Sequence, residues 1–167
     1  MIIIGIDPGL ATTGYGVIKK VKKNGKGAFL CLGYGLIKTL PLFSQGERLK
    51  KIHKELNFIL KKYQPEILAV ENIYFFKNLK TAMPVSQAKG VILFTAASRK
   101  IPVHEFTPLQ VKMRLTGYGR ADKKEVQKET QKILKLKELP KPDDAADALA
   151  IAICYAQLSK KPSQLTA

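Results

Sequence analysis

Short apolar runs between turn residues predict five β-strands. The first run ends in Asp7, and Pro8-Gly9 follow at once, which is typical of a buried strand that delivers an acid into a loop. Asn24-Gly25, between the second and third runs, favours a hairpin, so we expect the chain to open with an antiparallel meander. The five expected strands are residues 2–7, 14–21, 28–38, 66–71 and 101–105.

Apolar positions at helical spacing predict five helices. Ser44 and Glu47 have the spacing of a capping box at the start of the first helix, and Pro65 stops it. Thr107 followed by proline starts the third helix, and Asp122 caps the fourth. With their caps, the expected helices are residues 44–64, 78–99, 107–116, 122–136 and 143–159.

This order of elements predicts an α/β fold with a mixed five-stranded sheet and helices on both of its faces. A length of 167 residues suits one domain, which we expect over residues 1–159 with a frayed tail at 160–167. No stretch reaches the roughly 18 apolar residues that span a bilayer, and the amino terminus lacks the basic leader of a signal peptide. Cys31 and Cys154 form no Cys-x-x-Cys pair, so we expect reduced thiols, a cytoplasmic protein and no membrane partner.

The charge balance indicates what kind of partner the protein binds. The chain has 29 lysines and arginines but only 13 aspartates and glutamates, for a net charge of +16. Such an excess acts on partners rather than on the fold. It favours a polyanion, with nucleic acid ahead of an acidic membrane surface.

Four of the acids stand where the pattern is otherwise apolar. Asp7 and Glu71 each close an apolar strand, and Asp144 and Asp147 interrupt an alanine-rich helix. Positions three apart share a helix face, so Asp144 and Asp147 point the same way. Asp143 lies four residues before Asp147 and could pair with it as well, so spacing alone does not choose between Asp143 and Asp144. The simpler alternatives are a helix cap for Asp143 or Asp144, a turn for Asp7 and a lysine pair for Glu71.

Brought together, four carboxylates would repel one another strongly, and hard divalent cations remove that repulsion. Mg²⁺ prefers oxygen ligands, and two such ions roughly 3.5–4 Å apart form the usual clamp for in-line displacement at phosphorus. An acidic pocket in a basic protein suits a nuclease, because the basic surface holds the polyanion while the acids hold the metals. The pattern therefore indicates metal-dependent cleavage of nucleic acid.

Three motifs in this chain resemble one known family. Residues 4–9 (IGIDPG) and 13–18 (TGYGVI) look like the opening of the RuvC-type Holliday-junction resolvases. Val70-Glu71-Asn72 resembles their second acidic strand end, and residues 144–150 (DAADALA) resemble their carboxy-terminal signature. Order and spacing match from Ile2 to about Gln157, and the three motifs together are highly specific.

The resemblance implies a ribonuclease-H-like fold and a homodimer that cuts four-way DNA junctions in recombination and repair, by paired, symmetric nicks with 5′-phosphate and 3′-hydroxyl ends. It implies that Asp7, Glu71, Asp144 and Asp147 are the catalytic metal ligands, and it favours Asp144 over Asp143. The implied cofactor is Mg²⁺, two ions in each active site, with Mn²⁺ as a substitute. The implied protein partner is a branch-migration complex of RuvA with RuvB.

The same resemblance implies contacts with DNA. Lys112 and Lys123 match basic family positions near the scissile strand, where either could stabilise charge on the phosphate as a catalytic residue. Tyr74 stands three residues after the glutamate, at a position where the family has an aromatic residue and many relatives have phenylalanine, and tyrosine still offers a stacking face. The further expected contacts are Phe75, Lys77, Asn78, Lys80 and Arg120, with a core position as the alternative for Phe75 or Phe76.

Three other functions compete with this interpretation. An actin-like or sugar-kinase-like phosphotransferase also has Asp-x-Gly after its first strand, but it needs two such domains and leaves Asp144 and Asp147 unexplained. A non-catalytic DNA-binding module explains the charge and leaves four acids at motif spacing unexplained. Another ribonuclease-H-like nuclease, acting on a different branched DNA or an RNA–DNA hybrid, would use the same metal chemistry.

Overall fold

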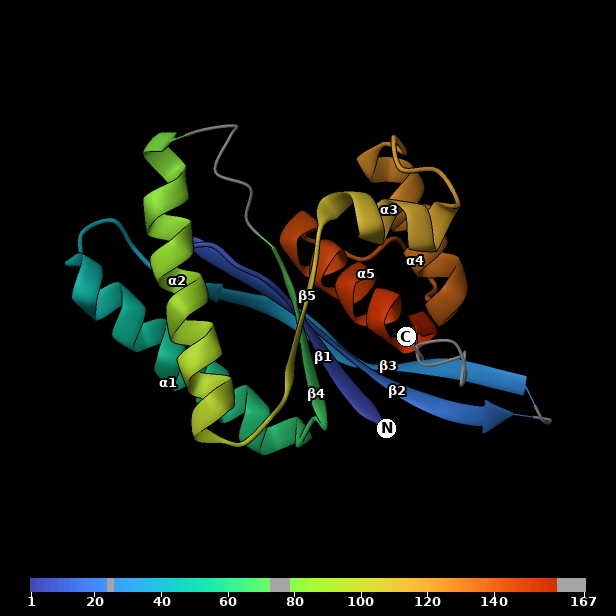
Figure 1. Cartoon of the computed structure of the whole chain (residues 1–167), viewed down its shortest axis with the longest axis horizontal. Coiled ribbons are helices and arrows are strands. Elements are labelled where there is room, and N and C mark those ends of the chain that lie inside the picture. Colours follow the sequence, from blue (N-terminus) through green and yellow to red (C-terminus); the bar gives the residue numbers. More distant parts are fainter. Residues whose placement is uncertain (24–25, 73–78, 159–167) are drawn as a thin grey trace, which may run out of the picture.

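The computed structural model of the chain describes residues 1–23, 26–72 and 79–158, which form a five-stranded sheet in the order β3-β2-β1-β4-β5 (Figure 1). β1 pairs antiparallel with β2, β2 pairs antiparallel with β3, and β4 and β5 run parallel to β1. The predicted mixed sheet is therefore confirmed. The strands are β1 (Ile2–Asp7), β2 (Thr12–Lys23), β3 (Lys26–Lys38), β4 (Ile67–Glu71) and β5 (Val103–Phe106).

Helices cover both faces of this sheet, also as predicted. Figure 1 shows α1 and α2 on one side of the sheet and α3, α4 and α5 on the other. No helix in the part of the chain that the structure describes is long and apolar enough to cross a membrane. The helices are α1 (Gln45–Tyr63), α2 (Leu79–Ser98), α3 (Pro108–Thr116), α4 (Lys123–Leu134) and α5 (Asp143–Leu158).

The predicted helix starts at Ser44, Thr107 and Asp122 are all confirmed as capping boxes, in which cap and third residue each bind the other's backbone N–H. The capping alternative for Asp143 or Asp144 is wrong. The carbonyl of Pro142 accepts hydrogen bonds from the N–H groups of residues 145 and 146, both at 3.1 Å, so both aspartates lie inside the first turn of α5.

Some element bounds differ from the expectation. β2 and β3 extend to the pair Lys23↔Lys26, beyond the apolar runs, because ladder hydrogen bonds join backbones and do not need apolar side chains. β5 begins two residues later than expected and ends at Phe106. The Asn24-Gly25 turn and the tail at 160–167 lie outside the described residues, and a single domain over 1–159 stays a prediction.

The core has two parts, one on each face of the sheet. The strict alternation of β1 sends Ile3 toward α5 and sends Ile4 and Ile6 toward α1 and α2. All three isoleucine side chains are completely buried. α5 lies between the sheet and the pair α3 and α4, which explains why it is apolar around most of its circumference.

α5 packs directly on the backbone of β1 and β2. A Cβ atom at Gly14 would overlap the backbone oxygen of Asp144, and a Cβ at Gly5 would overlap that of Ala148. A Cβ at Gly16 would lie 2.7 Å from the backbone nitrogen of Leu149. Glycine at these positions therefore allows a helix–strand contact that any side chain would prevent.

Replacing Gly14 with alanine should push the first turn of α5 away from β2. We expect Gly14→Ala to lower the free energy of unfolding by about 1–3 kcal/mol, the usual cost of overpacking a close contact. Denaturant unfolding measures this. Gly46→Ala is the matched control: nothing lies within 4 Å of its Cβ position in α1, so it should be neutral or stabilising. Equal stability of both variants would contradict the close contact.

Candidate active site

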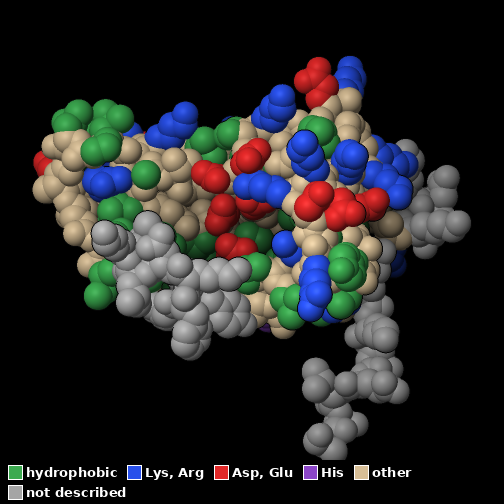
Figure 2. All heavy atoms as spheres, turned by 90° about the horizontal axis from the view of Figure 1, so that it is seen from above, with side chains coloured by type: hydrophobic (Ala, Val, Ile, Leu, Met, Phe, Trp, Pro, Cys, Tyr) green, Lys and Arg blue, Asp and Glu red, His purple; other side chains and the backbone are tan. Residues whose placement is uncertain are grey.

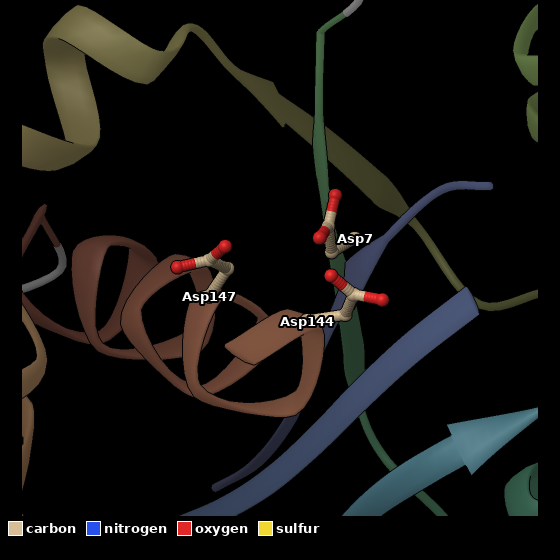
Figure 3. A group of neighbouring side chains, drawn as sticks. All are labelled: Asp7, Asp144 and Asp147. Carbon is tan, nitrogen blue, oxygen red and sulfur yellow. The ribbon is translucent and has the colours of Figure 1, made fainter. Parts of the chain in front are cut away.

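Three aspartates from two elements meet at one end of the sheet (Figure 3). Asp7 is the last residue of β1, and Asp144 and Asp147 lie one turn apart on α5. One carboxylate oxygen from each lies within 4.8 Å of the other two, and all three residues are partly buried. Carboxylate oxygens are the ligands that Mg²⁺ and similar hard cations prefer, so this group could hold a metal ion.

Glu71 lies beside this group without belonging to it. β4 runs parallel to β1 with Ile6 paired to Val70. Glu71 and Asp7 are therefore the last residues of neighbouring strands and lie at the same end of the sheet. Glu71 also lines a cavity of about 220 Å³, and its charge acts on Asp7 more strongly than that of either other aspartate. The residues that line the cavity include Lys112, Lys123, Asp147 and Ile151.

Burial and mutual repulsion make these acids hard to ionise. Burial raises the pKa of Asp7 to about 8, with the charges of Glu71, Asp147 and Asp144 adding to the rise. Burial, followed by the charge of Asp147, raises the pKa of Glu71 to about 7. Both effects disfavour the charged form, and a bound cation would reverse them. The local electrostatics therefore fit a metal centre better than a set of free carboxylates.

Lys123, the first residue of α4, forms ion pairs with two aspartates of α5. Its Nζ lies 3.0 Å from Oδ2 of Asp147 and 3.4 Å from Oδ2 of Asp143. Burial alone would lower the pKa of Lys123, but its hydrogen bond to Asp147 and the charges of both aspartates raise it. This lysine therefore stays a cation at the rim of the site.

The structure separates Asp143 from Asp144. Asp143 is exposed and accepts a hydrogen bond from Nε2 of Gln127 at 3.1 Å, and this bond, together with Lys123, lowers its pKa. Asp144 turns inward and joins Asp7 and Asp147. Spacing left open which of the two aspartates lies with Asp147, and the packing of α5 on the sheet places Asp144 there.

The basic residues expected at DNA lie in different places. Lys112 and Lys123 line the cavity beside Asp147, and Arg120 is exposed in the loop between α3 and α4. Figure 2 shows acidic side chains gathered in a hollow of the surface, with lysine and arginine side chains beside them. Tyr74, Phe75, Phe76, Lys77 and Asn78 lie outside the described residues, as does the side chain of Lys80 in the first turn of α2.

One polar contact near the site was not expected from the sequence pattern. Lys89 of α2 binds both Asn72, the residue after Glu71, and Glu105 of β5. A single charge in a long uncharged stretch could have indicated such a contact, because Lys89 is the only charged residue between positions 81 and 98.

The comparisons with known proteins agree with one another. A family model described as "Crossover junction endodeoxyribonuclease RuvC" matches residues 3–155. A relative of that name from Desulforamulus reducens is 49% identical over 159 residues, which are 95% of each chain. Solved structures of Thermus thermophilus RuvC, alone and in complex with Holliday junction substrate, are 38% identical with a TM-score of 0.87. The first covers 95% of this chain and 97% of its own chain, and the second covers 96% and 95%. This structural similarity over nearly the whole chain confirms the predicted ribonuclease-H-like fold.

The raised pKa values predict how stability depends on pH. Asp7 and Glu71 ionise near 4 when unfolded but at about 8 and about 7 when folded, so between these values the folded state holds protons that the unfolded state releases. We therefore expect the metal-free protein to lose stability as pH rises from about 4 to about 8. Mg²⁺ should stabilise it more at pH 8 than at pH 6, because protons compete with the ion.

Thermal unfolding across this pH range, in chelator and in Mg²⁺, measures both effects. Asp7→Asn removes the group with the higher pKa, so this variant should show a shallower dependence on pH. Rising stability of the metal-free wild type over the same range would contradict the assignment.

Proposed function

Because the chain belongs to the RuvC family of crossover junction endodeoxyribonucleases, we propose that it resolves four-way (Holliday) DNA junctions by metal-dependent hydrolysis. The observation that carries this proposal is the group of Asp7, Asp144 and Asp147 inside a chain of net charge +16. A similar solved protein, 38% identical, holds a Holliday junction substrate. The expected products are paired, symmetric nicks with 5′-phosphate and 3′-hydroxyl ends, made during recombination and repair.

The acidic group would bind Mg²⁺, for which Mn²⁺ would substitute. Asp7, Asp144 and Asp147 would hold one ion, and Glu71, whose charge acts on Asp7, would help to hold a second. Two bound ions would activate a water for attack on phosphorus and stabilise the leaving 3′ oxygen. Asp7 would be the shared ligand in this proposal, because its strand ends beside that of Glu71 and its carboxylate lies with the two aspartates of α5.

The two cavity lysines would act on the substrate itself. Lys112 and Lys123 line the cavity next to Glu71 and Asp147, where a phosphate held at the acids would also meet their charges. Asp143 keeps Lys123 at this rim through an ion pair of 3.4 Å. A cation at Asp147 would therefore leave Lys123 held by Asp143 and turned toward the phosphate.

Paired nicks need two active sites, and α2 offers a surface for a homodimer. Met83 and Phe94 lie three turns apart on one face of α2, and their side chains are 66% and 64% exposed. The one charge between positions 81 and 98, on Lys89, turns inward to Glu105. An uncharged helix face packed against its copy across a two-fold axis would give two equivalent sites for two equivalent strands.

The remaining parts of the proposal concern the cell. A branch-migration complex of RuvA and RuvB would deliver the junction to the dimer. A cytoplasmic location fits the two free thiols, since Cys31 is partly buried and Cys154 is fully buried. A single nuclease domain over residues 1–159 fits the two apolar clusters that share one sheet.

Asp7→Asn, Asp144→Asn and Asp147→Asn should each lower the rate of junction cleavage by at least about a thousandfold, because metal ligands act as a unit. Junction binding without divalent cations should persist. Glu55→Gln is the control, because Glu55 is a partly exposed carboxylate on α1 that pairs with Lys51 at 3.5 Å and lies outside the aspartate group, so it should keep cleavage within about tenfold of wild type. Near wild-type cleavage by Asp7→Asn would overturn the metal-site assignment.

The test uses an end-labelled mobile four-way junction with Mg²⁺, beside a linear duplex and an RNA–DNA hybrid. Paired nicks near the crossover, confined to the junction, are the expected result. Cleavage of the hybrid instead would support the metal site but assign the protein to another class of nuclease. Junction binding without cleavage in Mg²⁺ or Mn²⁺ would make it a binding module.

The dimer face predicts a change in molecular mass. Phe94→Lys places a charge on the uncharged face of α2, and burying it unpaired is costly, so the protein should sediment as a monomer. Leu30→Lys is the control, since Leu30 is also exposed, at 52%, but lies on β3 away from α2. Sedimentation equilibrium measures both, and an unchanged mass for Phe94→Lys would exclude this face.

A further inference from the structure

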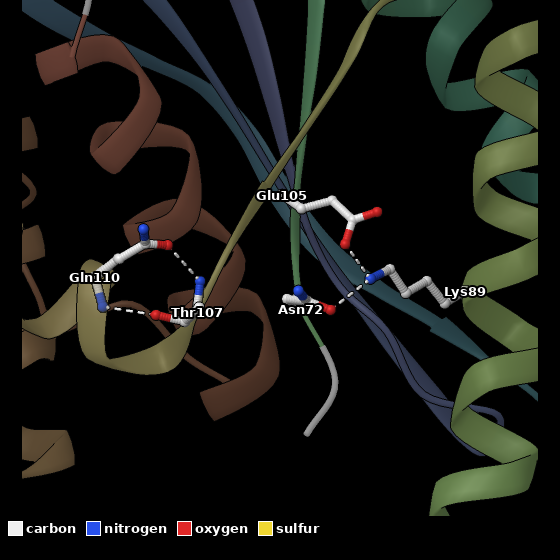
Figure 4. Close-up of polar contacts among 5 residues, drawn as sticks. All are labelled: Asn72, Lys89, Glu105, Thr107 and Gln110. Carbon is white, nitrogen blue, oxygen red and sulfur yellow. Dashed lines mark hydrogen bonds and ion pairs between the residues drawn. The ribbon is translucent and has the colours of Figure 1, made fainter. Parts of the chain in front are cut away.

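Lys89 is the most shielded lysine among the ion pairs of the described residues, with a side chain only 12% exposed. Its Nζ donates to Oε2 of Glu105 at 2.6 Å and to Oδ1 of Asn72 at 3.1 Å (Figure 4). Both bonds are charge-assisted, and the carboxylate contact is short. A helix on one face of the sheet is thereby joined to the ends of two neighbouring strands.

Asn72 is held from two directions. Its backbone N–H donates to the carbonyl of Phe106 at 2.7 Å, directly after the pair Glu71↔Phe106 in the β4–β5 register. Its side-chain oxygen accepts from Lys89 of α2. The residue that follows Glu71 is therefore fixed both along the sheet and across it.

Fixing Asn72 also fixes the direction of Glu71. Neighbouring side chains of an extended chain point to opposite faces of a sheet. Asn72 points to α2, so Glu71 points to α5, where it lines the cavity with Asp147. β5 repeats this alternation, because Glu105 meets Lys89 while the Phe106 ring meets Tyr155 of α5.

We propose that Lys89 is a positioning residue for Glu71. Through Asn72 and Glu105 it holds the end of β4 in the rotation that turns the Glu71 carboxylate toward Asp7 and Asp147. Lys89 itself lies on the opposite face of the sheet and does not touch the substrate. This inference rests on the proposed role of Glu71 as a metal ligand.

The experiment compares Lys89→Met with Lys89→Arg in the full chain. Calorimetric titration of the DNA-free protein with Mn²⁺ should show about tenfold weaker binding for Lys89→Met, the usual effect of losing a group that orients a ligand. Cleavage of saturating junction should need a correspondingly higher Mg²⁺ concentration. Lys89→Arg keeps the charge and both contacts in reach, so it should restore Mn²⁺ binding to within about threefold.

Two controls separate positioning from a general loss of structure. Lys51→Met breaks an exposed lysine–glutamate pair on α1, between Lys51 and Glu55 at 3.5 Å, and should leave Mn²⁺ binding unchanged. Thermal unfolding in chelator should show all variants folded at the temperature of the titration. Wild-type Mn²⁺ affinity in Lys89→Met would overturn the proposal.

Glu71→Gln shows whether Lys89 acts through Glu71. In that background Lys89→Met should cause no further loss of Mn²⁺ affinity, because the side chain that Lys89 positions is no longer a carboxylate. An equal loss in both backgrounds would mean that Lys89 acts elsewhere. Wild-type Mn²⁺ binding by Glu71→Gln alone would instead overturn the role of Glu71, and that result does not depend on any change at Lys89.

Discussion

The direct contact of α5 with the backbone of β1 and β2 is the constraint on which the site depends. Glycines at positions 5, 14 and 16 leave no side chains between the helix and the strands, so α5 lies directly against the sheet from Asp144 to Ala152. Its first turn is thereby brought to the end of β1, where Asp144 and Asp147 meet Asp7. A helix held at ordinary distance by side chains would keep these carboxylates apart, and no cation could bind all three.

This packing brings negative charge together in a chain that is otherwise strongly basic. Burial and repulsion raise the pKa values of Asp7 and Glu71, so the folded protein keeps the site at the expense of stability near neutral pH. Lys123 offsets part of the charge on the α5 side, and Lys89 holds the strand end that carries Glu71 on the α2 side. A cation bound among these carboxylates would offset their repulsion and return that stability.

The two acidic strand ends reach the site by different means. Asp7 is placed by the close packing of α5 on β1, whereas Glu71 is placed by the alternation of β4, whose next residue is tied to α2 and β5. α2 therefore has two roles in the proposed enzyme. One face would pack against the second copy, and Lys89 on another face would support the metal centre.

Local patterns in the sequence determined the five strands, the capped helix starts and the four acids at strand ends and on α5, because alternation, helical spacing and capping are set by near neighbours. The family motifs added the expected function, because three short motifs stand in the family's order and spacing along the chain. Helical spacing left Asp143 and Asp144 open and the family motif favoured Asp144, but only the tertiary structure shows which one turns toward β1. It also decided the partners of Lys123 and Lys89, because ion pairs between segments distant in sequence depend on packing that no local period records.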